Sequence, residues 1–161
     1  MDVLWNPWRY NYITGDKPAD NTDCIFCSLA QDPARDEDNF ILKRAEFNFV
    51  VLNRFPYSAG HMLIIPYEHV AMLDGMDDEA ASEMMALTRS AQTALSDVYS
   101  PDGFNLGMNL GASAGAGVAG HLHMHILPRW SGDVNFLTAI GDTRNIPESL
   151  PDTYRKLKNK I

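Results

Sequence analysis

Three of the five histidines in the chain occur at every second position of one short segment, GHLHMHI (residues 120–126). In a β-strand, successive side chains point to opposite faces of the sheet. The segment therefore predicts a strand whose two faces differ in chemistry. One face carries His121, His123 and His125, and the other carries Leu122, Met124 and Ile126. We expect the apolar face to pack inward and the histidines to line a surface or a cleft.

Two kinds of chemistry fit three histidines on one face. In the first, they bind a metal, since a His-x-His pair on a strand presents two ring nitrogens to zinc. In the second, the middle histidine is a nucleophile toward phosphorus, and its neighbours orient it and hold the leaving phosphates. The preceding segment, GASAGAGVAG (residues 111–120), is rich in glycine. Because glycines let backbone N–H groups approach an anionic ligand closely, this loop favours a phosphate ligand.

Length and charge limit the remaining possibilities. A chain of 161 residues fits one domain, and we expect a single domain over residues 1–161. The net charge of −8 and a pI near 4.9 argue against a nucleic-acid partner. No segment approaches the roughly 20 apolar residues of a membrane-spanning helix, and the N-terminus does not resemble a secretory signal. These features predict a cytoplasmic protein with no membrane partner.

The order of hydrophobic patterns predicts an α+β protein with a mainly antiparallel sheet. We expect an arm over 1–23, a short helix over 24–31, and strands over 40–44 and 46–56. A third strand falls in the segment 60–70 and stops at Pro66. A long amphipathic helix follows over 77–99, with Asp77 or Asp78 as its N-cap. A strand over 104–110, the histidine strand and a C-terminal helix over 145–161 complete the order.

The histidine segment resembles the signature of the histidine triad (HIT) nucleotide hydrolases and transferases. That signature is His-φ-His-φ-His-φ-φ, with φ apolar, and HLHMHIL matches it at every position. The segment VVLNRFPYSAGHMLIIP is similar to the nucleotide-binding hairpin of the family. With LWNPWRYNYI, CIFC, GHLHMHILPRW and GDVNF, the likeness is greatest to the branch that contains the bacterial diadenosine tetraphosphate phosphorylases. The resemblance implies a five-stranded sheet with one long helix and a C-terminal helix, joined edge to edge in a homodimer.

The resemblance also implies roles for individual residues. His123 attacks the α-phosphorus of a dinucleoside polyphosphate to form a nucleotidyl-histidine, and His125 contacts the leaving phosphates. A hydrogen bond from the other ring nitrogen of His123 to a backbone carbonyl would fix the reactive tautomer. The other nucleotide-binding positions are His61, Asn53 at the ribose, Asn109 at the α-phosphate, Gly115, Gly117 and Trp130 at the phosphates, and Leu63 and Val51 beside the base. Leu63 and Val51 fit a place in the core equally well.

The only two cysteines, Cys24 and Cys27, form a Cys-x-x-Cys pair, which in a cytosolic chain indicates metal or redox chemistry. Some bacterial HIT proteins, and the related galactose-1-phosphate uridylyltransferases, carry a structural zinc on such a pair. The resemblance implies a closed tetrahedral site formed by Cys24, Cys27, His69 and His121. The alternative is that both thiols are free. We expect no organic cofactor.

These features predict nucleotidyl transfer on diadenosine tetraphosphate or a related nucleotide, with inorganic phosphate as the acceptor. Water is the alternative acceptor, which would make the protein a hydrolase of dinucleoside polyphosphates or nucleoside phosphoramidates. The choice is close, because Gly117 stands where the phosphorylase branch often has a hydroxyl residue; backbone N–H groups or Ser113 would have to replace it. Two other possibilities are a nucleotide-binding protein without turnover and a hydrolase that uses all three histidines on one zinc.

Overall fold

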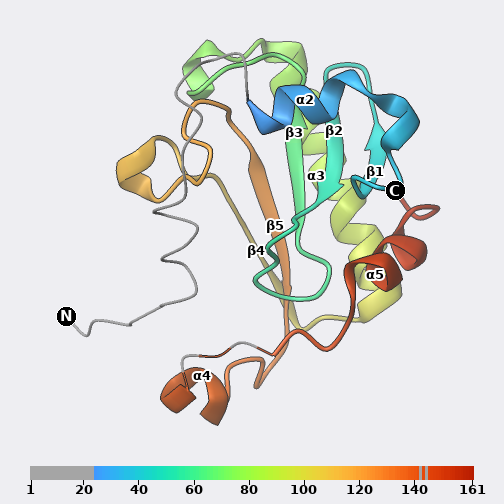
Figure 1. Cartoon of the computed structure of the whole chain (residues 1–161), viewed down its shortest axis with the longest axis vertical. Helices are drawn as coiled ribbons and strands as arrows, with labels where there is room; N and C mark the ends of the chain where they lie inside the picture. Colours follow the sequence, from blue (N-terminus) through green and yellow to red (C-terminus); the bar gives the residue numbers. More distant parts are fainter. Residues whose placement is uncertain (1–23, 142, 144) are drawn as a thin grey trace.

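The structure is a computed structural model, and it describes residues 24–141, 143 and 145–161 (Figure 1). The expected arm over 1–23 lies outside the described residues. The strands are β1 (Ile41–Arg44), β2 (Asn48–Leu52), β3 (Met62–Pro66), β4 (Gly103–Gly107) and β5 (Met124–Arg129). The helices are α2 (Ile25–Gln31), α3 (Asp78–Tyr99), α4 (Phe136–Gly141) and α5 (Leu150–Leu157).

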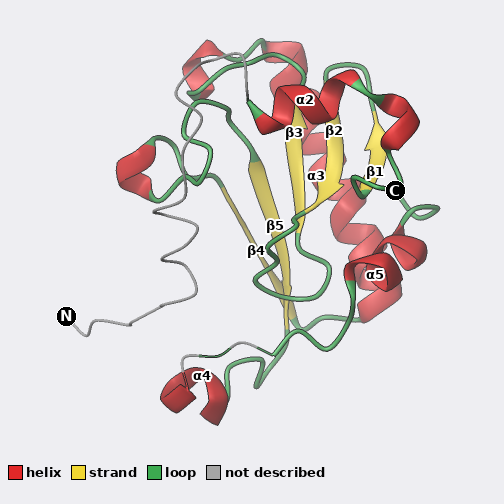
Figure 2. Ribbon diagram, viewed as in Figure 1, coloured by secondary structure: helices red, strands yellow, loops and turns green. Residues whose placement is uncertain are grey.

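The five strands form one antiparallel sheet in the order β1-β2-β3-β5-β4 (Figure 2). The first three strands form the predicted meander. The chain then leaves the sheet through α3, returns as the edge strand β4, and inserts β5 between β4 and β3. The predicted α+β class and five-stranded antiparallel sheet are therefore confirmed. The insertion places the histidine segment beside β3, which is the second strand of the predicted nucleotide-binding hairpin.

One face of the sheet packs against α3 and α5. The apolar positions predicted for the long helix are buried from Ala80 to Leu95, and Leu122 and Ile126 face the same cluster. The Asp77 side chain accepts a hydrogen bond of 2.8 Å from the Glu79 N–H, so the predicted N-cap is confirmed. Since a fully buried Leu or Met side chain contributes roughly 1.5–3 kcal/mol, this interface supplies much of the folding energy.

The opposite face is covered by α2, which lies across β2 and β3 (Figure 1). Phe26 of this helix packs into a second apolar cluster with Val51 and Leu63. Because helices cover both faces, every residue of β2 and β3 is buried. The short α2 therefore covers the face of the sheet to which the triad histidines belong.

The C-terminal part differs from the sequence prediction. The helix expected over 145–161 runs only from Leu150 to Leu157, capped by Ser149 and with a proline in its first turn. The short α4, which the sequence analysis did not predict, precedes it. Lys158 donates a hydrogen bond of 2.8 Å to the Ile41 carbonyl and so attaches the end of the chain to β1. Among the described residues, no helix combines the length and the apolar character needed to cross a bilayer.

Candidate functional site

The histidine segment is extended, but β5 begins only at Met124, so His121 and His123 precede the strand. The pairing with the chain after β3 continues beyond the strand, because the Leu122 N–H donates to the Val70 carbonyl at 2.7 Å. The alternation therefore persists, and Leu122 and Ile126 face α3 as predicted. Contrary to the prediction of a surface or cleft, His121 and His123 are buried. The reason is α2, which covers them.

His123 is held as a neutral imidazole with one free nitrogen. Its Nδ1 lies 2.9 Å from the carbonyl oxygen of His121. Because a carbonyl can only accept, Nδ1 carries the proton and Nε2 keeps its lone pair. Burial lowers the pKa of His123, and this effect outweighs the hydrogen bond from the carbonyl, which raises it. The ring therefore has the tautomer that a histidine nucleophile needs.

Phe26 fixes the plane of the His123 ring from the side of α2. Its ring centroid lies 5.0 Å from that of His123 and 5.5 Å from that of His121. His125 lies 4.9 Å from His123 on the other side. The sequence analysis missed Phe26. The available signal was its position between the two cysteines, which ties an apolar ring to the same short helix that approaches the histidines.

His61 contacts the last histidine of the triad. Its Nε2 lies 2.9 Å from Nδ1 of His125. The Nε2 of His125 is buried and makes no hydrogen bond to a described residue. Burial first, and then the neighbouring His123, lower the pKa of His125 to about 4. The structure thus joins His61, predicted from the hairpin, to the triad through a pair of neutral imidazoles.

Asn53 lies against the same pair. Its amide oxygen accepts the Phe55 N–H at 3.0 Å, which turns the amide nitrogen toward His61, 3.3 Å from Nδ1. The predicted base-wall residues are adjacent in the sheet: Val51 pairs with Leu63, and Leu63 pairs with His125. Directly paired residues share a face, so both apolar side chains lie on the face of His125.

The space beside His125 is open toward the sheet edge. Gly107 of β4 pairs with His125, and a Cβ at Gly107 would meet no atom within 4 Å. Leu63 lies on one flank of His125 and a residue without a side chain lies on the other. The side of His125 toward β4 therefore has more room than the side toward Leu63.

The glycine-rich loop leads from β4 back to His121. Gly115 has a φ of +89°, a left-handed conformation that favours glycine, and Gly120 packs beside His69. The N–H groups of residues 117–120 make no hydrogen bond to another described residue. Asn109 is half-buried between β4 and this loop. The N–H of Gly115 already donates to the Ala112 carbonyl at 3.0 Å, so of the two predicted glycines only Gly117 keeps a backbone donor without a described partner.

Trp130 is not brought to this group. It follows the last residue of β5, whereas His125 is near the first, so about 17 Å of strand separates them. Its indole N–H points to the Tyr99 carbonyl at 3.4 Å, and its ring packs edge-on against the Tyr99 ring. In this chain, the tryptophan packs at the end of α3.

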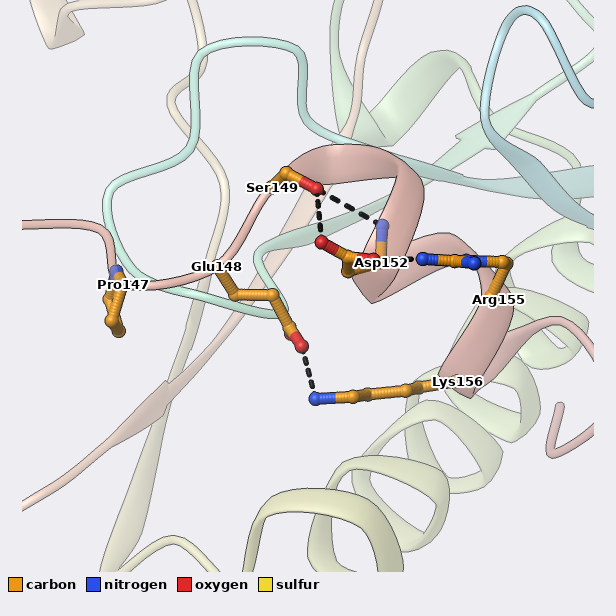
Figure 3. A pocket seen from close by; sticks show the side chains of 6 residues that line it. All are labelled: Pro147, Glu148, Ser149, Asp152, Arg155 and Lys156. Atoms are coloured by element: carbon orange, nitrogen blue, oxygen red, sulfur yellow. Dashed lines mark hydrogen bonds and ion pairs between the residues drawn. The ribbon is translucent and has the colours of Figure 1, made fainter.

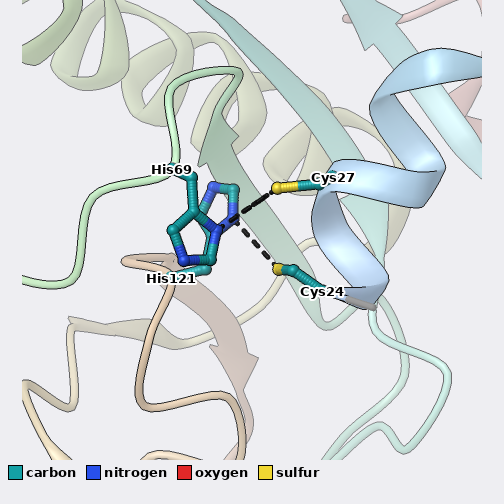
Figure 4. A group of neighbouring side chains, drawn as sticks. All are labelled: Cys24, Cys27, His69 and His121. Atoms are coloured by element: carbon teal, nitrogen blue, oxygen red, sulfur yellow. Dashed lines mark hydrogen bonds between the residues drawn. The ribbon is translucent and has the colours of Figure 1, made fainter. Parts of the chain in front are cut away.

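Four predicted ligand residues, Cys24, Cys27, His69 and His121, form a compact cluster (Figure 4). Their ligand atoms all lie within 4.8 Å of one another. Both cysteines come from α2, His69 follows β3, and His121 precedes β5. The Sγ of Cys27 is 3.3 Å from Nδ1 of His69, and the Sγ of Cys24 is 3.3 Å from Nδ1 of His121.

This donor set fits zinc. Bond lengths of about 2.3 Å to sulfur and about 2.0–2.1 Å to nitrogen give a tetrahedron with sulfur-to-nitrogen edges of about 3.6 Å. The cluster is close to that size. His121 also donates its other ring N–H, on Nε2, to the Pro66 carbonyl at 2.9 Å, so Nδ1 presents a lone pair to the cysteines. Burial, and then the adjacent Cys24, raise the pKa of Cys27; a bound cation would favour its thiolate.

The two roles of the triad are separated in space. Only His121 belongs to the cysteine cluster. His123 directs Nδ1 at a carbonyl and His125 directs Nδ1 at His61, so the three rings do not converge on one point. The arrangement therefore favours one histidine for a metal and another for phosphorus over a metal bound by all three.

A separate hollow of about 600 Å³ lies beside the first turn of α5 (Figure 3). Its charged side chains neutralise one another, since Lys156 pairs with Glu148 and Arg155 pairs with Asp152. None of the histidines lines it. We therefore assign this hollow to the packing of the C-terminal helix.

Comparison with known proteins places this geometry in a family. A family model described as "HIT domain" matches residues 34–132. The chain is 40% identical over 162 residues to a Mycobacterium tuberculosis protein described as "AP-4-A phosphorylase", covering 98% of this chain and 83% of that relative. It is 33% identical over 112 residues to "Adenylylsulfatase HINT3" of Arabidopsis thaliana, covering 69% of this chain and 54% of that relative.

Solved structures agree with this placement. A "ZN-bound histidine triad family protein" from Mycobacterium smegmatis superposes with a TM-score of 0.68 and 26% sequence identity, covering 86% of this chain and 93% of that one. The family model spans more than half of the chain, and the 40% identity extends along nearly all of it. The chain therefore belongs to the HIT domain family.

Proposed function

We propose that this protein is a nucleotidyl-transfer enzyme that acts on diadenosine tetraphosphate or a related dinucleoside polyphosphate through a covalent intermediate on His123. The observation that carries the proposal is the His121 carbonyl, which holds the proton of His123 on Nδ1 and leaves Nε2 free to attack. The 40% identity to a protein described as "AP-4-A phosphorylase" supports the substrate class.

In the first step, the lone pair on Nε2 of His123 forms a bond to the α-phosphorus. The bond from that phosphorus to the bridging oxygen breaks, and the remaining nucleoside polyphosphate leaves with the electron pair. The unpartnered Nε2 of His125 is placed to donate a hydrogen bond to the departing oxygen. The proton stays on Nδ1 of His123, hydrogen-bonded to the His121 carbonyl, which stabilises the positive charge on the substituted ring.

The nucleoside binds on the His125 face of the sheet. Leu63 and Val51 are buried in the cluster with Phe26, so they support the base pocket from below as core residues, and the Asn53 amide reaches the ribose. Asn109 and the N–H groups from Gly117 to Gly120 hold the phosphates from the loop side, and the left-handed Gly115 sets the path of the loop. We place Trp130 outside this pocket within one chain, because it packs on Tyr99.

In the second step, an acceptor oxygen attacks the phosphorus and returns the electron pair to Nε2. With inorganic phosphate, the overall products from diadenosine tetraphosphate are ATP and ADP; with water, they are ATP and AMP. We favour phosphate on the identity to the phosphorylase relative. Water remains the specific alternative, because the relative described as an adenylylsulfatase has a different reaction in its name. A nucleotide-binding protein without turnover is the other alternative.

Product analysis decides between these acceptors. The purified protein is incubated with diadenosine tetraphosphate, with and without millimolar inorganic phosphate, and the nucleotides are separated by chromatography. We expect ADP and ATP, formed at a rate that rises with phosphate. AMP and ATP at a rate independent of phosphate would establish the hydrolase, and no product at all would leave the binding protein.

We further propose that Cys24, Cys27, His69 and His121 hold a structural zinc. The compact donor set supports this site, as does the hydrogen bond from Nε2 of His121 to the Pro66 carbonyl, which orients the His121 ring. When bound, the metal joins α2 to the two segments that carry His69 and His121, and it takes no part in the chemistry. The related structure described as zinc-bound agrees with this expectation.

We also propose a homodimer through β4. This strand is one edge of the sheet, and most of its residues are exposed, including Leu106. An unpaired edge offers backbone donors and acceptors to a second strand. Two copies joined by their β4 strands would make one continuous sheet across both protomers.

A further inference from the structure

The loop between β2 and β3 is fixed to the sheet on both sides. The Asn53 N–H donates to the His61 carbonyl at 2.9 Å and closes the base of the loop. The Ser58 hydroxyl donates to the Pro128 carbonyl of β5 at 3.2 Å. Tyr57 lies between these two anchors and is half-buried. Its position is therefore set by the sheet.

Tyr57 contacts the histidine pair in two ways. Its backbone N–H donates to Nδ1 of His61 at 3.1 Å. Its ring lies 4.9 Å from the His61 ring and is nearly parallel to the His125 ring, at 11° and 6.3 Å between centroids. One residue thus covers both partners of the hydrogen bond between His61 and His125.

The backbone N–H decides the direction of that hydrogen bond. An amide N–H can only donate, so Nδ1 of His61 must be unprotonated. The proton of the neutral His61 ring is then on Nε2, which donates to Nδ1 of His125. His125 must in turn carry its own proton on Nε2. The atom that faces the leaving group is therefore a donor.

The opposite arrangement would be unproductive. If His61 carried its proton on Nδ1, its Nε2 would accept from Nδ1 of His125, and Nε2 of His125 would present a lone pair to the departing phosphate oxygen. Both arrangements make the same bond between the two rings. The Tyr57 N–H at 3.1 Å and the Asn53 side-chain amide at 3.3 Å distinguish them, because each would meet a second N–H in the second arrangement.

We propose that Tyr57 is a positioning residue for the transfer reaction. Its backbone N–H is the nearer of two donors to Nδ1 of His61, beside the Asn53 amide, and favours the arrangement in which His125 donates to the leaving group. Its ring excludes water from the His61–His125 bond. The proposal rests on the proposed function, in that it assumes His125 meets the leaving oxygen. The side-chain hydroxyl of Tyr57 has no part in it.

An amide-to-ester replacement tests the role of the N–H. Incorporating the α-hydroxy acid analogue of tyrosine at position 57 removes one N–H and keeps the ring. Since a hydrogen bond of this kind contributes about 1 kcal/mol, we expect the single-turnover rate on diadenosine tetraphosphate to fall about fivefold, with KM little changed. The matched control is the same ester chemistry at the exposed Met85 of α3, which is far from the histidines in sequence and fold.

Nitrogen-15 NMR of the histidine rings provides a reading that does not depend on catalysis. In the unmodified protein without nucleotide, we expect a protonated Nε2 on both His61 and His125. In the Tyr57 ester, we expect a mixture of the two arrangements. If the ester leaves both tautomers and the transfer rate unchanged, the proposal is overturned. If the tautomers shift but the unmodified protein has no transfer activity, the proposed function fails while the selection by Tyr57 stands.

Two side-chain variants test the role of the ring. Tyr57→Phe keeps the ring and the N–H, the two groups that the proposal uses, so we expect a rate within about twofold of the wild type. Tyr57→Leu keeps the N–H but exposes the histidine pair, so we expect slower transfer and faster solvent exchange of the ring proton between the histidines. A Phe variant as slow as the Leu variant would show that the hydroxyl acts instead. Equal exchange in Leu and wild type would remove the ring from the proposal.

Discussion

A carbonyl oxygen two residues earlier in the chain determines which nitrogen of His123 can react. The His121 carbonyl accepts a hydrogen bond from His123, its Nε2–H donates to the Pro66 carbonyl, and its Nδ1 faces the cysteines. One residue therefore connects the candidate metal site to the candidate nucleophile. Each histidine of the triad therefore has a different environment.

The neutral state of His125 predicts a pH dependence of stability. Burial lowers its pKa to about 4 in the folded chain, whereas histidine in an unfolded chain titrates near 6.5. Below about pH 6.5, the unfolded chain gains a proton that the folded chain does not accept. The stabilising contribution of this group is therefore complete above about pH 6.5 and is lost as the pH falls toward 4.

Urea unfolding of wild type and His125→Gln at several pH values between about 7.5 and 4.5 measures this effect. We expect the wild type to lose free energy of unfolding steadily relative to His125→Gln as the pH falls. Both proteins keep the same cysteine cluster, so any loss of metal in acid affects them equally. A difference that stays constant across this range would contradict the neutral buried state of His125.

Gly60 predicts a large steric effect next to the histidine pair. Its φ is +76°, and a Cβ at this position would lie 2.7 Å from a methyl group of Leu95 in α3. Gly60→Ala therefore combines the left-handed strain of an L-residue, about 1–2 kcal/mol, with a clash against a buried side chain. Chemical denaturation should show a loss of at least about 2 kcal/mol. Gly103→Ala, where a Cβ meets nothing within 4 Å, is the control, and an equally small loss at both sites would refute the argument.

At the scale of residues, the sequence predicted which histidines and cysteines come together, but it did not predict the side chains that pack around them. The alternation of histidines and the Cys-x-x-Cys spacing are local patterns, and the four cluster residues do come together. The contacts of Phe26 and Tyr57 could not be predicted, because they depend on how a helix and a loop distant in the sequence pack on the triad. Trp130 was grouped with the phosphates by likeness alone, whereas the length of β5 separates it from them.

At the scale of elements, Glu83 joins α3 to the turn between β1 and β2. Its carboxylate accepts the N–H groups of Glu46 and Phe47, each at 2.9 Å, and the side-chain amide of Asn48 at 2.9 Å. Burial raises its pKa, but these hydrogen bonds together lower it below the ordinary value. The helix therefore holds the turn through a charged acceptor.

Removing that acceptor should destabilise the protein. Glu83→Ala leaves the buried Asn48 amide and two backbone N–H groups without this partner, and we expect a loss of about 2–3 kcal/mol in the free energy of unfolding. Glu79→Ala, at an exposed position in the first turn of the same helix, should cost less than about 1 kcal/mol. Thermal and urea unfolding of both variants check the prediction. Losses of equal size would mean that helix charge, and not these hydrogen bonds, sets the effect.

Element types were predictable where one periodicity ran for many residues, as in α3 and the first three strands. The first and last residues of the elements were harder to predict. Phe40 was expected in the first strand, but it has a φ of +58°, which excludes it from the extended strand. The C-terminal helix begins late, because prolines fit only its first turn. The six-residue α4 is too short to give a clear helical period in the sequence.

At the scale of the whole molecule, the cysteine cluster joins α2 to the sheet. The helix has only seven residues, and no side chain caps its N-terminus. A helix of this length depends on tertiary contacts for its stability. Metal binding free energy would therefore become folding free energy for the layer that buries His123.

Elemental analysis and thermal unfolding of Cys24→Ser test this link. We expect about one zinc per chain in the wild type prepared without chelator, and both a lower zinc content and a Tm lower by several degrees in the variant. Ile25→Ser, at an exposed neighbouring position of the same helix, should keep its zinc. Absence of zinc from freshly prepared wild type, or a full zinc content in Cys24→Ser, would contradict the assignment.

In the proposed mechanism, the fold presents one nitrogen atom, Nε2 of His123, to a phosphorus atom. The most direct test is to detect the bond that it forms. Wild type is mixed with diadenosine tetraphosphate without inorganic phosphate and quenched in alkali, since a phosphorus bond to imidazole nitrogen is labile in acid. Peptide mass spectrometry then locates the adduct.

We predict an adenylyl group on His123 that disappears when the acceptor is added. His123→Ala should bind nucleotide, carry no adduct and lose activity on the order of a thousandfold or more. Product formation by the wild type with no adduct at His123, together with near-normal turnover by His123→Ala, would contradict the covalent mechanism.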